Sequence, residues 1–243
     1  MPVYRDEGVV LRTMPLGEAD RIVTILTRRT GRVRAVAKGV RRTTSRFGSR
    51  LEPATYVDLQ LYEGRALDTV TQAEILHPYG AQIAGDYARH TASAVMLEAA
   101  ERFTAEEREP SLKMFLLLVG GLRTLVAREH APRLVLDAFL LRSLTVAGYG
   151  MSLDECARCG QPGTYPNLSV SAGGVVCPEC RPPGAASVSV PALRLMVALV
   201  SGDWVGADAS PPPARREASG LVAAYLQWHI ERGLRALPHL ERT

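Results

Sequence analysis

The sequence lacks a long hydrophobic run, and aromatic residues make up only 6% of it. Its most apolar stretch, residues 114–119, is far shorter than the roughly 20 apolar residues that a membrane span requires. No apolar run follows a basic N-terminus, so we expect no signal peptide and an intracellular protein. With 47% hydrophobic and 22% charged residues among 243, the chain is expected to bury a real core, which excludes disorder as its main state.

Motifs of catalysis and nucleotide binding are absent as well. The sequence contains no GxxxxGKS/T, GxGxxG or GxSxG pattern, and its five histidines are scattered without an HExxH motif. The acidic run at Glu106, Glu107 and Glu109 is expected in the first turn of a helix, where it would complement the helix dipole rather than supply catalytic acids. We therefore predict that the protein is not an enzyme.

The first 80 residues have the pattern of short strands. Segments rich in β-branched residues are separated by Gly, Pro or charged turns. These segments are residues 8–11, 21–27, 32–37, 55–62 and 66–76. In the fourth, Val57, Leu59 and Leu61 fall on one face. Five short strands without a crossover helix predict a five-stranded OB-fold barrel in residues 1–80.

After residue 80 the hydrophobic period becomes that of helices. Helices are expected over residues 81–103, 110–128, 132–147, 191–200 and 214–237. Pro110 and Pro132 suit first helical turns, and Gly148 suits a helix end. Residues 150–187 are rich in Gly, Pro and Cys. The chain is thus expected to be an α+β multidomain protein, with an α-helical domain over 81–243 that carries an inserted module at 150–187.

All four cysteines lie in this module as two Cys-x-x-Cys pairs. Cys156 and Cys159 are separated by 17 residues from Cys177 and Cys180. This spacing matches the four-thiolate zinc template, so we predict one structural zinc ion per chain in a zinc ribbon. A closed four-thiolate site leaves no position for water or substrate. Two disulfides, which oxidising compartments favour, and ordinary buried cysteines are the alternatives.

Positive charge is concentrated in residues 28–50, which hold nine cations and no acid. Residues 1–80 carry 13 Lys and Arg against 9 Asp and Glu, whereas residues 81–243 carry 16 of each. A local basic patch of this kind attracts a phosphate backbone. The predicted DNA-binding residues are Arg32, Arg34, Lys38, Arg41, Arg42, Arg46, Arg50 and Phe47.

The cations of the third segment share one face if that strand is regular. Arg32 and Arg34 would then point outward, and the small apolar residues between them would face the core. Phe47, Tyr56 and Tyr62 are candidate platforms for stacking unpaired bases. The alternative is a solvated edge strand whose charges only discourage edge pairing.

The motifs along the chain resemble the bacterial RecO family of recombination mediator proteins. The matching motifs include Gly17-Glu-Ala-Asp-Arg-Ile-Val23 and Ala35-Val-Ala-Lys-Gly39. Their Gly-Glu-Ala-Asp-Arg and Ala-Lys-Gly segments are the specific part. The similarity begins at Gly8-Val-Val-Leu11 and extends through Ser45-Arg-Phe-Gly48 and residues 144–150 to the cysteine pairs. This resemblance implies an N-terminal OB-fold, a helical domain and a zinc module inserted in that domain.

The resemblance also implies a function in DNA repair and homologous recombination. A RecO protein is expected to bind single- and double-stranded DNA and to anneal complementary strands without ATP. With RecR, it helps load RecA on DNA coated by the single-stranded DNA-binding protein, as part of the RecF pathway. The implied partners are DNA, RecR and the acidic tail of the single-stranded DNA-binding protein, in the cytoplasm at the nucleoid and without a membrane.

Two other function classes use the same kinds of residues. An RNA-binding or transcription-related adaptor would also combine an OB-fold, a zinc ribbon and a basic patch, and a preference for RNA over DNA would support it. An enzyme with zinc chemistry is disfavoured by the closed four-thiolate spacing and the scattered histidines.

Overall fold

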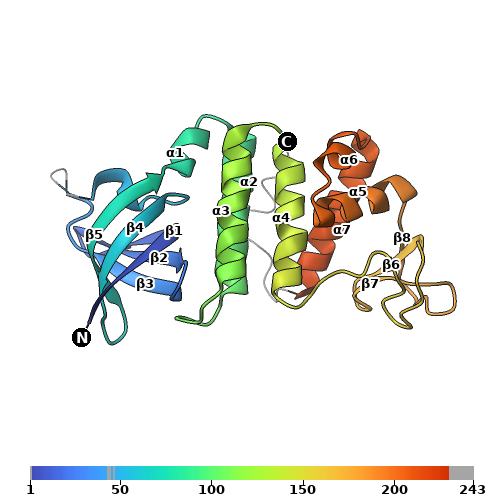
Figure 1. Ribbon diagram of the computed structural model, residues 1–243, viewed down its shortest axis with the longest axis horizontal. Helices are drawn as coiled ribbons and strands as arrows, with labels where there is room; N and C mark the ends of the chain where they lie inside the picture. Colours follow the sequence, from blue (N-terminus) through green and yellow to red (C-terminus); the bar gives the residue numbers. More distant parts are fainter. Residues whose placement is uncertain (1, 43–44, 46, 230–243) are drawn as a thin grey trace. The chain divides into compact units, whose positions relative to one another are not determined.

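The computed structural model describes residues 2–42, 45 and 47–229. The chain forms two compact units, which divide after Ala127 (Figure 1). The first unit contains the predicted barrel together with three helices, and the second contains the remaining helices and the cysteine module. The domain boundary expected after residue 80 stays a prediction.

Five strands of the described chain close into a barrel (Figure 1). They are β1 (Val3–Leu16), β2 (Asp20–Thr27), β3 (Gly31–Ala37), β4 (Tyr56–Tyr62) and β5 (Asp68–His77). Their order is β1-β2-β3-β5-β4, and β4 pairs back with β1. The β3–β5 pair is parallel, and the other neighbours are antiparallel. This is an OB-fold barrel, as predicted.

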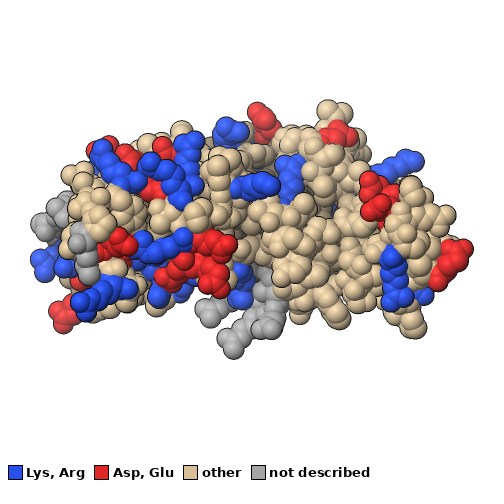
Figure 2. Space-filling model, turned by 60° about the horizontal axis from the view of Figure 1, so that its bottom comes forward, with Lys and Arg blue, Asp and Glu red and all other residues tan. Residues whose placement is uncertain are grey.

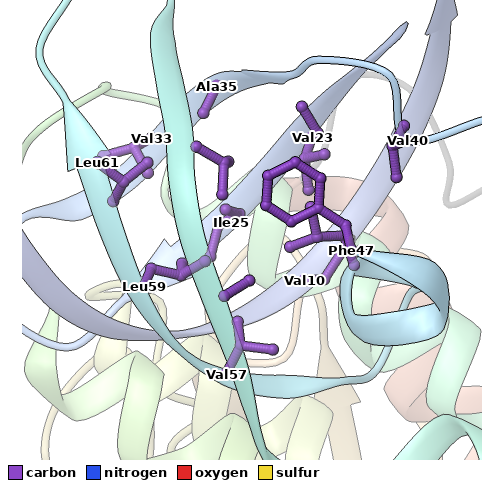
Figure 3. Packing of buried hydrophobic residues seen from close by; sticks show 14 residues of the cluster. Val10, Val23, Ile25, Val33, Ala35, Val40, Phe47, Val57, Leu59 and Leu61 are labelled. Carbon is purple, nitrogen blue, oxygen red and sulfur yellow. The ribbon is translucent and has the colours of Figure 1, made fainter. Parts of the chain in front are cut away.

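Alternate residues of the strands fill the barrel. Val57, Leu59 and Leu61 of β4 are 0% exposed, as the alternation predicted. Val33 and Ala35 of β3 are buried in the same cluster. Figure 3 shows side chains from both strands pointing into one core. The burial of one face of β3 leaves its alternate residues on the outside of the barrel.

The first strand is much longer than the segment 8–11 that the pattern predicted. Residues 3–9 pair with β4, and residues 8–16 pair with β2, with an irregularity between Val10 and Arg12. Charged residues interrupt the apolar alternation in the N-terminal part of β1. One of them, Asp6, is buried and accepts hydrogen bonds from the backbone N–H groups of Arg29 and Thr30. Partners distant in sequence therefore extend the strand beyond its apolar stretch.

Three α-helices follow the barrel in the first unit: α1 (Tyr79–Ile83), α2 (Tyr87–Phe103) and α3 (Leu112–Ala127). The single helix expected over 81–103 is divided, because Asp86 caps α2 by accepting from the Arg89 N–H at 3.1 Å. The first-turn position predicted for Pro110 is wrong, since α3 begins at Leu112. Helices α2 and α3 pack against β1.

The second unit contains four helices within the described residues: α4 (Pro132–Val146), α5 (Val190–Ser201), α6 (Trp204–Asp208) and α7 (Pro212–His229). Pro132 occupies the first turn of α4, as predicted. The cysteine module carries a sheet of β6 (Asn167–Ser169), β7 (Gly174–Val175) and β8 (Ala186–Ser187). The end of the helix predicted over 214–237 lies outside the described residues. No helix in the described part of the chain has the length and apolarity to cross a membrane.

Candidate nucleic-acid interface and metal centre

The arginines on the outside of β3 contact the segment of residues 104–109, which joins α2 to α3 and which we call the acidic strap. The Arg32 guanidinium donates hydrogen bonds to the carbonyl oxygens of Thr104, at 2.6 Å, and Ala105. Its side chain is only 12% exposed. Arg34 Nε donates to Glu107 Oε1 at 2.6 Å. Arg32 therefore holds the acidic strap, and Arg34 has a carboxylate partner.

The first-turn position predicted for the acidic run is wrong. The first turn of α3 contains no acid, because the acids precede the helix and lie in the acidic strap. Glu107 forms a parallel β-bridge with Arg32, and the Arg108 N–H donates to the Arg32 carbonyl at 2.9 Å. The Arg108 guanidinium donates to buried Asp68 at 2.6 Å. These charges stabilise a contact between the barrel and the acidic strap.

A second group of cations lies in residues 38–42, which we call the basic loop. The β1–β2 turn holds this loop through its backbone. Asp20 Oδ1 accepts from the Gly39 N–H at 2.7 Å, and the Ala19 carbonyl accepts from the Arg41 N–H at 2.9 Å. A loop held at two backbone positions presents its side chains from a defined place on the barrel.

The basic loop exposes its three cationic side chains. They are Lys38, Arg41 and Arg42. The Arg41 guanidinium also donates to the Gly17 carbonyl at 3.1 Å, which directs it toward the β1–β2 turn. Arg50 is exposed on the short helix η1 (Gly48–Leu51), and Arg46 lies outside the described residues. The structure thus brings three of the predicted DNA-binding residues, Lys38, Arg41 and Arg42, together on one loop.

The aromatic residues differ from one another in exposure. Phe47 is 2% exposed and fills the barrel core, so the expected stacking platform is wrong there (Figure 3). Tyr56 packs edge-on against Phe115, and its hydroxyl donates to Glu7 at 2.6 Å. Burial and this hydrogen bond raise the pKa of Tyr56, and the same bond lowers the pKa of Glu7. Tyr62 is 41% exposed.

Acids accompany many of the cations of the 28–50 segment. Figure 2 shows Lys and Arg side chains interspersed with Asp and Glu over the barrel unit. Arg28 pairs with Glu7 at 3.2 Å, and Arg29 pairs with Asp6 at 3.5 Å. The run that contains no acid in sequence is therefore partly neutralised by acids from other strands, and the basic loop is its more exposed part.

The four cysteines form one cluster in the second unit. All four are free, and their Sγ atoms lie within 4.8 Å of one another. The Sγ atoms of Cys159 and Cys177 are 3.9 Å apart. A tetrahedral site with metal–sulfur bonds of about 2.3 Å has sulfur–sulfur edges of about 3.8 Å. The cluster therefore has the size and donor set to hold a metal ion.

Backbone hydrogen bonds shape both cysteine pairs. The Cys156 N–H donates to the Gln161 carbonyl at 2.8 Å, and the Cys180 N–H donates to the Cys177 carbonyl at 3.2 Å. Gly160, with a φ of +71°, makes the turn after the first pair. The Cys177 N–H donates to Cys156 Sγ at 3.4 Å and lowers the pKa of that thiol to about 6. Burial raises the pKa of Cys177 to about 12.

Comparison with known families assigns both parts of the chain. Residues 1–79 match the family model for the recombination protein O N terminal, and residues 84–238 match that for the recombination protein O C terminal. The chain belongs to the RecO family. The Asp20–Gly39 hydrogen bond joins residues 17–23 and 35–39, two of the segments on which the sequence resemblance to RecO rests.

RecO relatives match over the full length of the chain. It is 74% identical over 243 residues to the DNA repair protein RecO of Frankia casuarinae, and 61% identical over 243 residues to that of Thermobifida fusca. It is 58% identical over 248 residues to the DNA repair protein RecO of Streptomyces griseus. Each match covers 100% of both chains.

Sequence reasoning missed the residues that position the RecO basic loop and the acidic strap. Asp20 lies within residues 17–23, but its role in holding the basic loop depends on Gly39, which is 19 residues away. The neighbours of Glu107 in sequence predict a position in a helix turn, whereas its ion-pair partner, Arg34, is 73 residues away. The sequence offers one signal for the role of Asp20. Its carboxylate follows the turn residues Gly17 and Ala19, and acids in such turns typically accept hydrogen bonds from backbone N–H groups.

Proposed function

We propose that this RecO protein binds single- and double-stranded DNA through its barrel and anneals complementary strands during repair by homologous recombination. The basic loop carries this proposal, because it exposes Lys38, Arg41 and Arg42 beside the β1–β2 turn. In OB-folds the loop between the first two strands is part of the surface that binds oligonucleotides. The names of the RecO relatives support a role in DNA repair.

Annealing by such a surface needs no nucleotide hydrolysis. Two DNA strands repel each other through their phosphates, and a shared basic surface neutralises part of that charge. No phosphate-binding loop is present in the sequence, so ATP has no motif-defined site. The protein thus acts as a binding and annealing factor and not as an enzyme.

We assign the cysteine cluster to one structural zinc ion bound by Cys156, Cys159, Cys177 and Cys180. Four cysteine sulfurs within 4.8 Å of one another are the donor set that structural zinc prefers. Zinc would stabilise the thiolate form of buried Cys177, whose proton is otherwise firmly held. Its role is to order the ribbon, since four protein ligands leave no coordination position for a substrate.

Membership of the RecO family supports the remaining part of the proposal, which concerns the protein partners. In this proposal the protein acts in the cytoplasm at the nucleoid and, with RecR, helps load RecA on DNA coated by the single-stranded DNA-binding protein. The acidic tail of that protein is the proposed contact with this chain. RNA-binding is the competing function, and binding to RNA in preference to DNA would favour it.

The deciding experiment is annealing of complementary oligonucleotides, with and without ATP, by wild type and by the double variant Arg41→Glu/Arg42→Glu. If about five phosphates are neutralised, log affinity for single strands should fall against log salt with a slope of roughly −3.5. The double variant should flatten this slope and abolish annealing with the fold intact. Arg194→Glu/Arg216→Glu, at exposed positions of α5 and α7, makes the same charge change and should anneal normally.

Two results would contradict the proposal. DNA binding that is unchanged in Arg41→Glu/Arg42→Glu would move the site away from the basic loop. Annealing that required ATP hydrolysis by the purified protein would contradict the nucleotide-independent mechanism. Parallel titrations with RNA of the same sequence test the adaptor function directly.

A further inference from the structure

The acidic strap lies on the face of the barrel that OB-folds commonly use for oligonucleotides. That face is formed by the second and third strands. Here Arg34 of β3 lies opposite Thr24 of β2, and Arg32 lies opposite Leu26. Thr24 and Leu26 are 2% and 0% exposed. This end of the β2–β3 face is therefore covered within the first unit.

The backbone of the acidic strap is firmly held on the barrel. Arg32 donates to two of its carbonyl oxygens, and the Arg108 N–H donates back to the Arg32 carbonyl. At Gly31, which has a φ of +86°, a Cβ atom would lie 1.9 Å from the Glu109 carbonyl oxygen. A side chain at position 31 would push the acidic strap away. The backbone contact is thus part of the fold.

The Glu107 side chain makes a different kind of contact. Its carboxylate lies 2.6 Å from Arg34 Nε and 3.8 Å from Arg32 Nη1. The side chains of Arg34 and Glu107 are 41% and 38% exposed, so water reaches this ion pair. Exposed pairs of this type are weak and are easily exchanged for another anion. The Glu107 carboxylate is therefore paired with a surface arginine that a phosphate could also reach.

Arg34 is also in line with the basic loop. It lies on the outer face of β3 and precedes Lys38, the first residue after the strand, by four positions, which corresponds to about 13 Å of extended chain. A nucleic acid strand bound at the basic loop would bring further phosphates to Arg34 at a high effective concentration. A small free anion lacks this second attachment.

We propose that Glu107 is an intramolecular competitor for Arg34, which a phosphate of bound DNA displaces. In the free protein Glu107 neutralises Arg34, and in the complex Arg34 becomes an additional phosphate contact while the backbone of the acidic strap stays in place. This inference rests on the proposed binding of DNA at the basic loop. Its consequence is selectivity, because a strand that also contacts the basic loop competes with Glu107 better than an isolated anion does.

The test is salt-dependent binding of single-stranded oligonucleotides by Glu107→Gln. This variant should bind about two- to fivefold more tightly, the range that loss of an exposed ion pair allows. The slope of log affinity against log salt should stay that of the wild type, because Arg34 contacts a phosphate in both complexes and only the competing carboxylate is lost. Glu106→Gln is the matched control, since it removes an exposed charge from the same acidic strap and should change affinity less.

A double-mutant cycle assigns the gain to Arg34. In an Arg34→Gln background, Glu107→Gln should leave the affinity unchanged. A gain that persists there, an equal gain from Glu106→Gln, or no gain from Glu107→Gln would overturn the competitor inference. Circular dichroism of each variant verifies that the barrel is folded.

The same titrations separate this inference from the proposed function. If Arg41→Glu/Arg42→Glu loses DNA binding and Glu107→Gln gains none, the basic loop stands as the DNA site and Glu107 is not a competitor. If Arg41→Glu/Arg42→Glu binds DNA like the wild type, the proposed site itself fails, whatever Glu107→Gln does.

Discussion

The Asp20 carboxylate accepts a hydrogen bond from the Gly39 backbone N–H, with an oxygen–nitrogen distance of 2.7 Å. This bond joins the start of β2 to the loop that follows β3, so it connects two of the segments on which the resemblance to RecO rests. Gly39 has a φ of +67°, a conformation that glycine adopts without strain. An acid beside the basic loop thus serves to position the cations around it.

Replacement of Asp20 by Ala is expected to weaken binding of single-stranded DNA severalfold. Loss of a negative charge would by itself strengthen DNA binding, so weaker binding must come from a less ordered basic loop. A hydrogen bond to a charged group contributes about 1.5–3 kcal/mol to the free energy of unfolding. Because Asp20 is partly exposed, we expect a loss of stability near the lower end of this range. Oligonucleotide titration and urea unfolding measure the two effects.

Two further variants at the β1–β2 turn serve as controls. Asp20→Asn keeps an oxygen acceptor and should restore most of the affinity. Glu18→Ala removes an exposed acid from the same turn and should bind DNA at least as tightly as the wild type. If Asp20→Ala also bound DNA more tightly, its charge and not its hydrogen bond would be what matters.

Arg32 and Arg34 are expected to differ sharply when each is changed to Gln. Arg32→Gln loses hydrogen bonds to two carbonyl oxygens of the acidic strap at a mostly buried position, so the free energy of unfolding should fall by about 2 kcal/mol. Arg34→Gln breaks only an exposed ion pair, which contributes less than about 1 kcal/mol. Urea unfolding compares the two variants, and equal losses of stability would refute the structural role assigned to Arg32.

The barrel and most helices could be predicted because their signals are local. Alternation at Val57, Leu59 and Leu61 places one face of β4 in the core, and a Cys-x-x-Cys pair makes its own turn. Such patterns depend on a few neighbouring residues. They therefore appear in the sequence before any tertiary contact is known.

The exposure of the cations proposed to bind DNA could be predicted only in part, because charged side chains have partners that are distant in sequence. The segment that contains Phe47 has the composition of an exposed cationic loop, yet the barrel interior requires an apolar side chain there. Arg32 and Arg34 appeared free in their own segment, whereas α2 ends where residues 104–109 can reach them. Local composition indicates which charged residues are present, but not which of them remain unpaired and able to contact a phosphate.

Asp137 of α4 is expected to make stability depend on pH. It is buried, accepts a hydrogen bond from Ser219 and lies 3.4 Å from Arg133, and burial raises its pKa to about 6. In the unfolded chain an Asp has a pKa of about 3.9. The folded state therefore holds this proton more tightly, and raising the pH from about 4 to about 6 should destabilise the fold by on the order of 2 kcal/mol.

Comparison with Asp137→Asn isolates this contribution from other titrating groups. The Asn variant cannot ionise, so its free energy of unfolding minus that of the wild type should increase between pH 4 and pH 7. Urea unfolding at both pH values gives this difference. A difference that is the same at pH 4 and pH 7 would show that the Asp137 proton is not linked to folding.

Replacement of Cys177 by Ser is expected to release the zinc ion and loosen residues 150–187. The cluster of buried residues around the cysteines is small, with Cys156, Val176 and Cys177 at its centre. Burial of so few side chains stabilises little structure, so most of the order should come from metal ligation. Metal analysis should give one zinc per wild-type chain and a clear loss in the variant. Hydrogen exchange should show faster exchange across the ribbon.

The barrel should keep its fold and its DNA contact in Cys177→Ser, because it has its own core in the first unit. Salt-dependent DNA binding by the variant tests this directly. Thr164→Ser, a change at an exposed position between the two cysteine pairs, should retain zinc and serves as the control. Full zinc retention in Cys177→Ser would refute the ligand assignment. Complete loss of DNA affinity with an intact barrel would instead place the ribbon itself on the DNA.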